Sequence, residues 1–177
     1  MNSEAAKLAV NGGKAAVRKP LAAFSSIGAR EKAAVREFLD RGGLQSGFHG
    51  SARPSFFGGE QVRAFEASWS NRFGVQHSVS VNSATSGLIA AMGAVGIGPG
   101  DEVIVPPFTM TATALAPLIY GGVPVFVDVE PEYFCLNIDL VEAAITPATR
   151  AIIAVNLFGH PADLVRLRTL ALSLIHI

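Results

Sequence analysis

Residues Val79–Leu88 read VSVNSATSGL, in which an alternating apolar segment runs directly into a turn of small residues. The alternation over His77–Val81 predicts a strand, and the apolar spacing over Ser83–Val95 predicts a helix. The chain therefore passes from strand to helix within a few residues. A short strand-to-helix connection of this kind is typical of α/β proteins.

The turn itself places small polar residues at the start of the predicted helix. The backbone N–H groups of Ala84, Thr85 and Ser86 would be exposed at the helix N-terminus, which carries about half a positive charge. Such an end suits a phosphate group, to which a threonine or serine hydroxyl would add a hydrogen-bond donor. Capping of the helix by Asn82 or Ser83 accounts for the same residues without any ligand.

Outward from this turn, strands and helices alternate along the chain. The predicted strands cover Glu102–Val105, Val123–Val129 and Arg150–Leu157. The predicted helices cover Glu31–Asp40, Gln61–Phe73, Thr109–Ile119, Leu140–Ile145 and a segment that starts at Asp163–Leu170. Leu44–Glu60, rich in glycine, serine and phenylalanine, has no period and predicts a loop. The alternation indicates βα units and a mostly parallel sheet.

The composition narrows the class of protein. Of the 177 residues, 50% are apolar and only 16% are charged, which excludes a disordered chain. Fourteen basic and fourteen acidic residues cancel, and the basic excess is confined to the first 41 residues, so a nucleic-acid partner is disfavoured. The single cysteine, Cys135, excludes an internal disulfide and fits a reducing cytoplasm.

Membrane and metal-binding classes are disfavoured as well. Val103–Val127 is uncharged and long enough to span a bilayer, but four prolines and a Gly-Gly pair divide it into short elements. Met1–Pro20 lacks the apolar segment of a signal peptide. The histidines are too scattered to suggest a metal site.

One helix carries an apolar stripe that is expected in the core. Within Gln61–Phe73, the side chains of Val62, Phe65, Trp69 and Phe73 fall on one face at helical spacing. An aromatic stripe of this kind is more often packed inside the protein than used to bind a ligand.

From Gln45 to Leu167 the sequence resembles, in unbroken order, the DegT/DnrJ/EryC1/StrS sugar aminotransferases. The matching segments are VRAFEASWSNRFGV, VNSATSGLIAAMGAVGIGPGDEVIVPPFTMTATA, VPVFVDVEPEYFCLN and ITPATRAIIAVNLFGHPADL. The resemblance implies an α/β fold, the large domain of fold-type-I enzymes that depend on pyridoxal 5′-phosphate (PLP). It implies a PLP-dependent transfer of an amino group from glutamate or glutamine to a keto-sugar nucleotide.

The resemblance also assigns roles to four residues. The small-residue turn that holds the PLP phosphate in the family corresponds to Ala84 and Thr85. Met110 stands where the family usually has an aromatic residue against the pyridine ring, and a thioether can also cover such a ring. Asn156 falls at the end of a strand that faces the cofactor cleft.

Two catalytic residues of the family have no counterpart in this chain. The lysine that holds PLP and the acid that binds its ring nitrogen would lie beyond residue 177, and the four lysines present all precede residue 33. We therefore expect an amino-terminal part of such an enzyme, inactive by itself. The expected divisions are an N-terminal helical segment (1–44), a partial PLP-binding large domain (45–171) and a non-native tail (172–177).

Other activities of the same family stay open, namely dehydration, amination of a cyclitol, or a non-catalytic regulatory or binding role.

The resemblance further implies a cytoplasmic protein that is a homodimer when complete. It also implies a three-stranded parallel sheet with Glu102–Val105 in the middle, where it joins the other two strands. His77–Val81 is expected to stay unpaired with these strands, because the equivalent strand of the family lies on the far side of strands that follow this chain.

Overall fold

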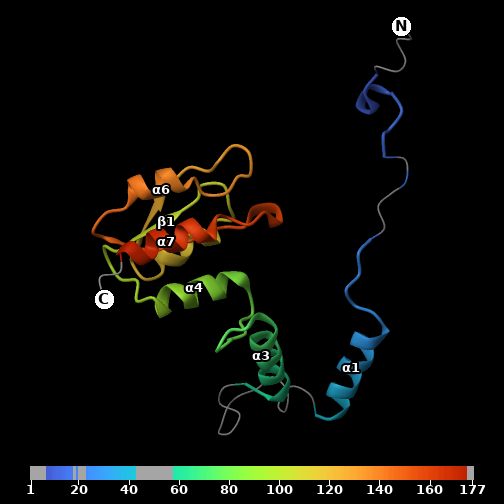
Figure 1. Ribbon diagram of the computed structural model, residues 1–177. Helices are drawn as coiled ribbons and strands as arrows, with labels where there is room; N and C mark the ends of the chain where they lie inside the picture. The colour runs from blue at the N-terminus through green and yellow to red at the C-terminus, as the bar shows by residue number, and fades with distance from the viewer. Residues whose placement is uncertain (1–6, 18, 20–22, 43–57, 175–177) are drawn as a thin grey trace. The chain divides into compact units, whose positions relative to one another are not determined.

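The computed structural model describes residues 7–17, 19, 23–42 and 58–174 (Figure 1). The chain divides into two compact units, Met1–Val75 and Gln76–Ile177. The expected boundary between residues 44 and 45 lies outside the described residues, so the N-terminal division stays a prediction.

The first unit is helical. It contains a short 3-10 helix, η1 (Ala9–Asn11), and two α-helices, α1 (Ala29–Asp40) and α3 (Glu60–Phe73). Both α-helices confirm the sequence prediction to within two residues. At the start of α1 the Glu31 carboxylate accepts a hydrogen bond of 2.7 Å from the Gly28 N–H, and α3 ends at Gly74, where φ is +63°. Most of the predicted loop Leu44–Glu60 lies outside the described residues.

The aromatic stripe of α3 is not buried, so its expected place in the core is wrong for the structure described. Phe65, Trp69 and Phe73 are 56%, 50% and 55% exposed. The rings pack on one another along the helix, with centroids 6.0 Å apart between Phe65 and Trp69 and 4.6 Å apart between Trp69 and Phe73. Spacing of four residues brings helical side chains together whether or not another element covers them, which is why the pattern misled.

The second unit alternates helices with short strands. Its elements in chain order are α4 (Ala84–Ala94), β1 (Glu102–Val105), α5 (Ala112–Leu118), β2 (Val123–Phe126), α6 (Ile138–Ala144), β3 (Thr149–Ile152), η2 (Leu157–Gly159) and α7 (Leu164–Leu174). The helix predicted from Thr109 begins later, because residues 109–111 are irregular and α5 starts at Ala112. The strand predicted over Arg150–Leu157 ends at Ile152, so Asn156 follows the strand by four residues and does not end it, and Leu157 lies in η2. The helix α7 continues through the expected tail boundary at 171/172.

The sheet has three parallel strands in the order β2-β1-β3. Ile104 is in register with Val125 on one side and with Ile152 on the other. The predicted position of Glu102–Val105 in the middle is therefore confirmed. His77–Val81 forms no strand of this sheet, so its prediction as a strand is wrong for the structure described, although its separation from the other three strands was expected.

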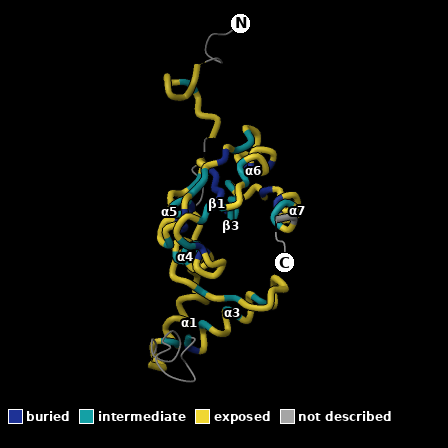
Figure 2. The backbone as a smooth tube through the Cα atoms, turned by 90° about the vertical axis from the view of Figure 1, so that its left-hand side faces the viewer, coloured by how far each residue is buried: buried dark blue, intermediate teal, exposed yellow. Residues whose placement is uncertain are grey.

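Helices cover both faces of the sheet, as Figure 2 shows around β1 and β3. Successive side chains of a strand point to opposite faces. On one face, Val103 and Val105 pack in a cluster with residues of α4 and α5, including Met92 and Ala116. On the other face, Ile104 packs with residues of α6 and α7 such as Val141 and Leu167. Val103, Ile104 and Val105 have no exposed surface, which makes β1 the centre of the core.

At the amino end of β1, Asp101 ties the preceding turn to the neighbouring strand. Its carboxylate accepts hydrogen bonds from the Gly98 N–H at 2.9 Å and from the Arg150 Nε at 3.1 Å. The Gly98 N–H and, next, the Arg150 guanidinium hold the pKa of Asp101 below its usual range. The charged form of Asp101 is therefore favoured in the folded state.

We predict that Asp101→Asn lowers the stability of the chain in a pH-dependent way. Because the pKa of Asp101 is lowered in the folded state, its carboxylate makes its full contribution to the free energy of unfolding above the ordinary aspartate pKa of 3.8. This contribution is lost as the pH falls through the lowered pKa. Urea midpoints measured from neutral pH downward should show a difference between wild type and variant that shrinks below about pH 4. Asp40→Asn, at the exposed end of α1, is the control. A difference that persists undiminished into strong acid would refute the assignment.

Candidate functional site

The N-terminus of α4 is capped by Ser83. Its Oγ accepts a hydrogen bond of 3.1 Å from the Ser86 N–H, and the Ser86 hydroxyl donates to Asn82 Oδ1 at 2.6 Å. The sequence left open whether Asn82 or Ser83 caps the helix, and the structure shows Ser83 as the cap. The Ser86 N–H was expected to be exposed to a ligand, and this expectation is wrong because that N–H donates to the cap.

The two remaining donors at this end are free to bind a ligand. Within the described chain, the N–H groups of Ala84 and Thr85 have no acceptor, because the first intrahelical bond runs from Gly87 to Ser83. Both residues are exposed, and the first turn of α4 contains no acidic residue. This end of α4 therefore offers two N–H groups, the Thr85 hydroxyl and a positive helix terminus, and it fits a phosphate group.

The candidate segments share one edge of the sheet. Parallel strands present their carboxyl ends at the same edge, so the segments that carry Met110 after β1 and Asn156 after β3 leave the sheet as neighbours. The helix α4 packs on the sheet and is joined to β1 by residues 95–101, so it runs back along the sheet. Ala84 and Thr85 consequently lie toward that same carboxyl edge. Ligands of open α/β sheets bind at this edge.

Met110 lies at the end of an anchored loop. Its side chain is 78% exposed, while its carbonyl accepts a hydrogen bond of 3.0 Å from the Thr113 N–H. The hydroxyls of Thr109 and Thr113 lie 3.0 Å apart, and Thr113 is buried. The backbone beside Met110 is thus fixed while its thioether is free to contact a ligand.

Asn156 has a structural task that sequence reasoning did not foresee. Its Oδ1 accepts a hydrogen bond of 3.0 Å from the Ala162 N–H, which closes the turn between β3 and α7. Asn156 is exposed, and its amide carbonyl is committed to the turn. It therefore shapes the edge of the site through the backbone of residues 157–162.

Aromatic side chains gather at the same edge, and sequence reasoning missed them. The rings of Phe108, Phe134 and Phe158 contact one another, and those of Tyr133 and His160 are stacked with centroids 4.3 Å apart. Each lies in a segment that follows a strand. That position was readable from the sequence, but their mutual contact depends on the strand order.

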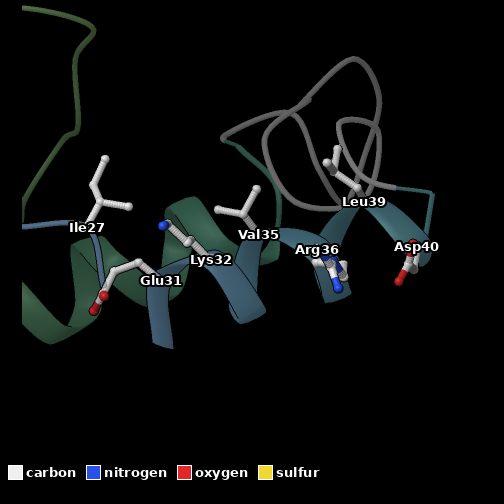
Figure 3. Close-up of a pocket in the computed structure, with 7 residues that line it drawn as sticks. All are labelled: Ile27, Glu31, Lys32, Val35, Arg36, Leu39 and Asp40. Carbon is white, nitrogen blue, oxygen red and sulfur yellow. The ribbon is translucent and has the colours of Figure 1, made fainter. Parts of the chain in front are cut away.

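A separate hollow lies along α1 in the first unit. Figure 3 shows its lining, in which apolar side chains alternate with charged ones: Ile27, Glu31, Lys32, Val35, Arg36, Leu39 and Asp40. None of the four expected cofactor residues belongs to it. In the described ranges no group of three or more histidine, cysteine or acidic residues could hold a metal ion, and no helix is long and apolar enough to cross a membrane.

Comparison with solved structures shows which class of proteins shares this fold. The chain aligns with NtdA from Bacillus subtilis, solved with bound pyridoxamine 5′-phosphate, at a TM-score of 0.72 and 30% identity, covering 83% of this chain and 32% of the other. The fold, a three-stranded parallel sheet with flanking helices, is therefore that of PLP-dependent aminotransferases.

The family follows from the sequence comparison. The family model described as the DegT/DnrJ/EryC1/StrS aminotransferase family matches residues 27–174, and the chain belongs to this family. Its members depend on PLP, so the cofactor expected from the resemblance is confirmed at the level of the family.

Two curated relatives indicate the range of activities. A UDP-N-acetyl-3-dehydro-α-D-glucosamine 3-aminotransferase from Acidithiobacillus ferrooxidans is 51% identical over 117 residues, which are 66% of this chain and 32% of that protein. An L-glutamine:2-deoxy-scyllo-inosose aminotransferase from Streptomyces kanamyceticus is 44% identical over 114 residues, which are 62% of this chain and 27% of that protein. The chain thus spans about a third of the length of the relatives it matches.

We predict that Ser83→Ala destabilises the chain by about 1 kcal/mol, because the Ser86 N–H loses its acceptor. Ser83→Thr keeps an acceptor oxygen, so its free energy of unfolding should stay within a few tenths of a kcal/mol of the wild-type value. Urea denaturation followed by circular dichroism measures both. Equal stability of wild type and Ser83→Ala would show that the cap does not hold α4.

Proposed function

We propose that this chain is the amino-terminal part of a PLP-dependent aminotransferase that acts on a keto sugar. The observation that carries the proposal is the acid-free N-terminus of α4, with two available N–H groups, at the carboxyl edge of the sheet. Family membership supports the reaction type. The 51% identity to an enzyme named for a UDP-linked keto sugar supports a sugar nucleotide as amino acceptor.

The chain's own residues would hold the cofactor at two points. The N–H groups of Ala84 and Thr85, with the Thr85 hydroxyl, would bind the phosphate. Met110 would lie against the ring, and Asn156 would keep the neighbouring turn in place. When bound, PLP supplies the carrier that accepts the amino group from the donor and passes it on.

The amino acceptor could also be a cyclitol, and one observation favours this second candidate. The relative from S. kanamyceticus is named for 2-deoxy-scyllo-inosose and is 44% identical. Glutamine as donor is supported by the same name, and glutamate is the other donor we propose. A nucleotide is therefore not common to both candidate acceptors, whereas a six-membered ring bearing a ketone is.

We further propose that the lysine and the acid of the reaction are contributed by a segment that follows this chain in the whole protein. The four lysines of the 177-residue chain all lie among residues 7–32, far in sequence from the segments at the carboxyl edge of the sheet. The proposal includes a homodimer and a cytoplasmic location for the complete enzyme. The 177-residue chain alone should transfer no amino group.

The test compares the complete protein with the 177-residue chain. Each is mixed with PLP and glutamine or glutamate, and the conversion to pyridoxamine phosphate is followed by absorbance. UDP-N-acetyl-3-dehydro-α-D-glucosamine or 2-deoxy-scyllo-inosose is then added, and the aminated product is detected by mass spectrometry. We expect product from the complete protein only. A complete protein that converts neither acceptor would refute the proposed function.

A second prediction concerns the phosphate. In the complete protein, Thr85→Asp should weaken PLP binding about tenfold or more, because it sets a negative charge beside the phosphate at a helix N-terminus. Thr85→Ser keeps the hydroxyl and should bind PLP like the parent. Equilibrium dialysis measures both affinities. If Thr85→Asp retained PLP as tightly as the parent, the phosphate would lie elsewhere.

A further inference from the structure

Three phenylalanines from three different connections meet at the carboxyl edge of the sheet. Phe108 follows β1, Phe134 follows β2 and Phe158 follows β3. Ring centroids are 5.5 Å apart between Phe108 and Phe134, 6.3 Å between Phe108 and Phe158, and 6.4 Å between Phe134 and Phe158. Phe108, Phe134 and Phe158 are 49%, 42% and 82% exposed, so the trio forms an apolar surface and not a buried core.

The backbone is strained where two of these rings are presented. In the described chain, Phe134 and Phe158 are the residues other than glycine with positive φ, at +59° and +53°. Left-handed backbone is unfavourable for a bulky residue, because its Cβ approaches the following carbonyl. Strain of this kind is retained where the surroundings impose it, and it gathers at ligand-binding positions.

The two strained segments are fastened to each other. The ring of Tyr133 stacks on that of His160 with an interplanar angle of 5°, beside the edge contact of Phe134 with Phe158. The buried Cys135 Sγ donates a hydrogen bond of 3.7 Å to the His160 carbonyl. These contacts join the two segments that carry Phe134 and Phe158, so the backbone beneath both rings is held together within this chain.

The trio adjoins the expected cofactor segments. Phe108 lies two residues before Met110, and Phe158 lies two residues after Asn156. Phe108 and Phe158 therefore lie in the same connections as Met110 and Asn156, at the edge of the sheet where the amino acceptor would approach a cofactor held by the N-terminus of α4. Binding sites are lined by apolar and aromatic side chains around a few polar groups, as this edge is.

From this geometry we infer that Phe108, Phe134 and Phe158 form an aromatic wall that receives the six-membered ring of the amino acceptor. The inference rests on the proposed function and deepens it. The apolar C–H groups on one face of a pyranose or cyclitol ring pack against aromatic faces, while the polar hydroxyls on its rim stay accessible to other groups. The wall would thus orient the ring that bears the ketone, whether or not a nucleotide is attached.

The test uses two substitutions at Phe158 in the complete protein loaded with PLP. Phe158→Gly removes the ring and suits a φ of +53°, so it keeps the turn without strain. Phe158→Tyr keeps an aromatic face. Phe24→Ala, at an exposed residue outside the trio, is the matched control. Single-turnover rates are measured separately for glutamine as donor and for 2-deoxy-scyllo-inosose and UDP-N-acetyl-3-dehydro-α-D-glucosamine as acceptors.

We expect Phe158→Gly to lower the single-turnover rate with the acceptor used by the wild type about tenfold, with the donor half-reaction unchanged. Phe158→Tyr and Phe24→Ala should keep both half-reactions. Equal loss of both half-reactions in Phe158→Gly, or no loss in either, would overturn the aromatic wall. A wild-type protein that accepts an amino group from the donor but passes it to neither acceptor would instead refute the proposed function, and with it this inference.

Discussion

The hydrogen bonding of β1 on both sides is the constraint on which the second unit depends. Glu102–Val105 pairs with β2 along one edge and with β3 along the other, and its three apolar side chains have no exposed surface. Because both partners run parallel to β1, all three strands send their connections out at the same edge. The segments that carry Met110 and Asn156 leave the sheet at that edge for this reason, and so do the three segments that carry the aromatic trio.

At the N-terminus of α4, one short sequence forms a cap and leaves two donors without an acceptor. Ser83 and Asn82 complete the cap through Ser86, and within the described chain the N–H groups of Ala84 and Thr85 have no acceptor. The two interpretations that the sequence left open, a cap and a phosphate site, are therefore compatible. The cap accepts a hydrogen bond from the Ser86 N–H and does not use the N–H groups of Ala84 and Thr85.

Much of this architecture could be predicted from the sequence, because alternation and helical spacing are local properties. Glu102–Val105 was predicted with its observed bounds, and its central position followed from the resemblance to a known family. Local patterns failed where tertiary context decides. His77–Val81 alternates like a strand but forms no strand of this sheet, and the rings of α3 follow a core pattern while half exposed. The aromatic trio was invisible because its members come from three connections that only the strand order brings together.

The central place of β1 has a consequence for the order in which the protein is made. Both neighbours of β1 lie later in the chain, β2 ending at Phe126 and β3 at Ile152. A ribosome therefore delivers the most buried strand of the sheet first, with both of its edges open until the later strands emerge. Open apolar edges invite pairing with other chains. During synthesis, β1 is thus the segment of this unit on which a chaperone would have most reason to act.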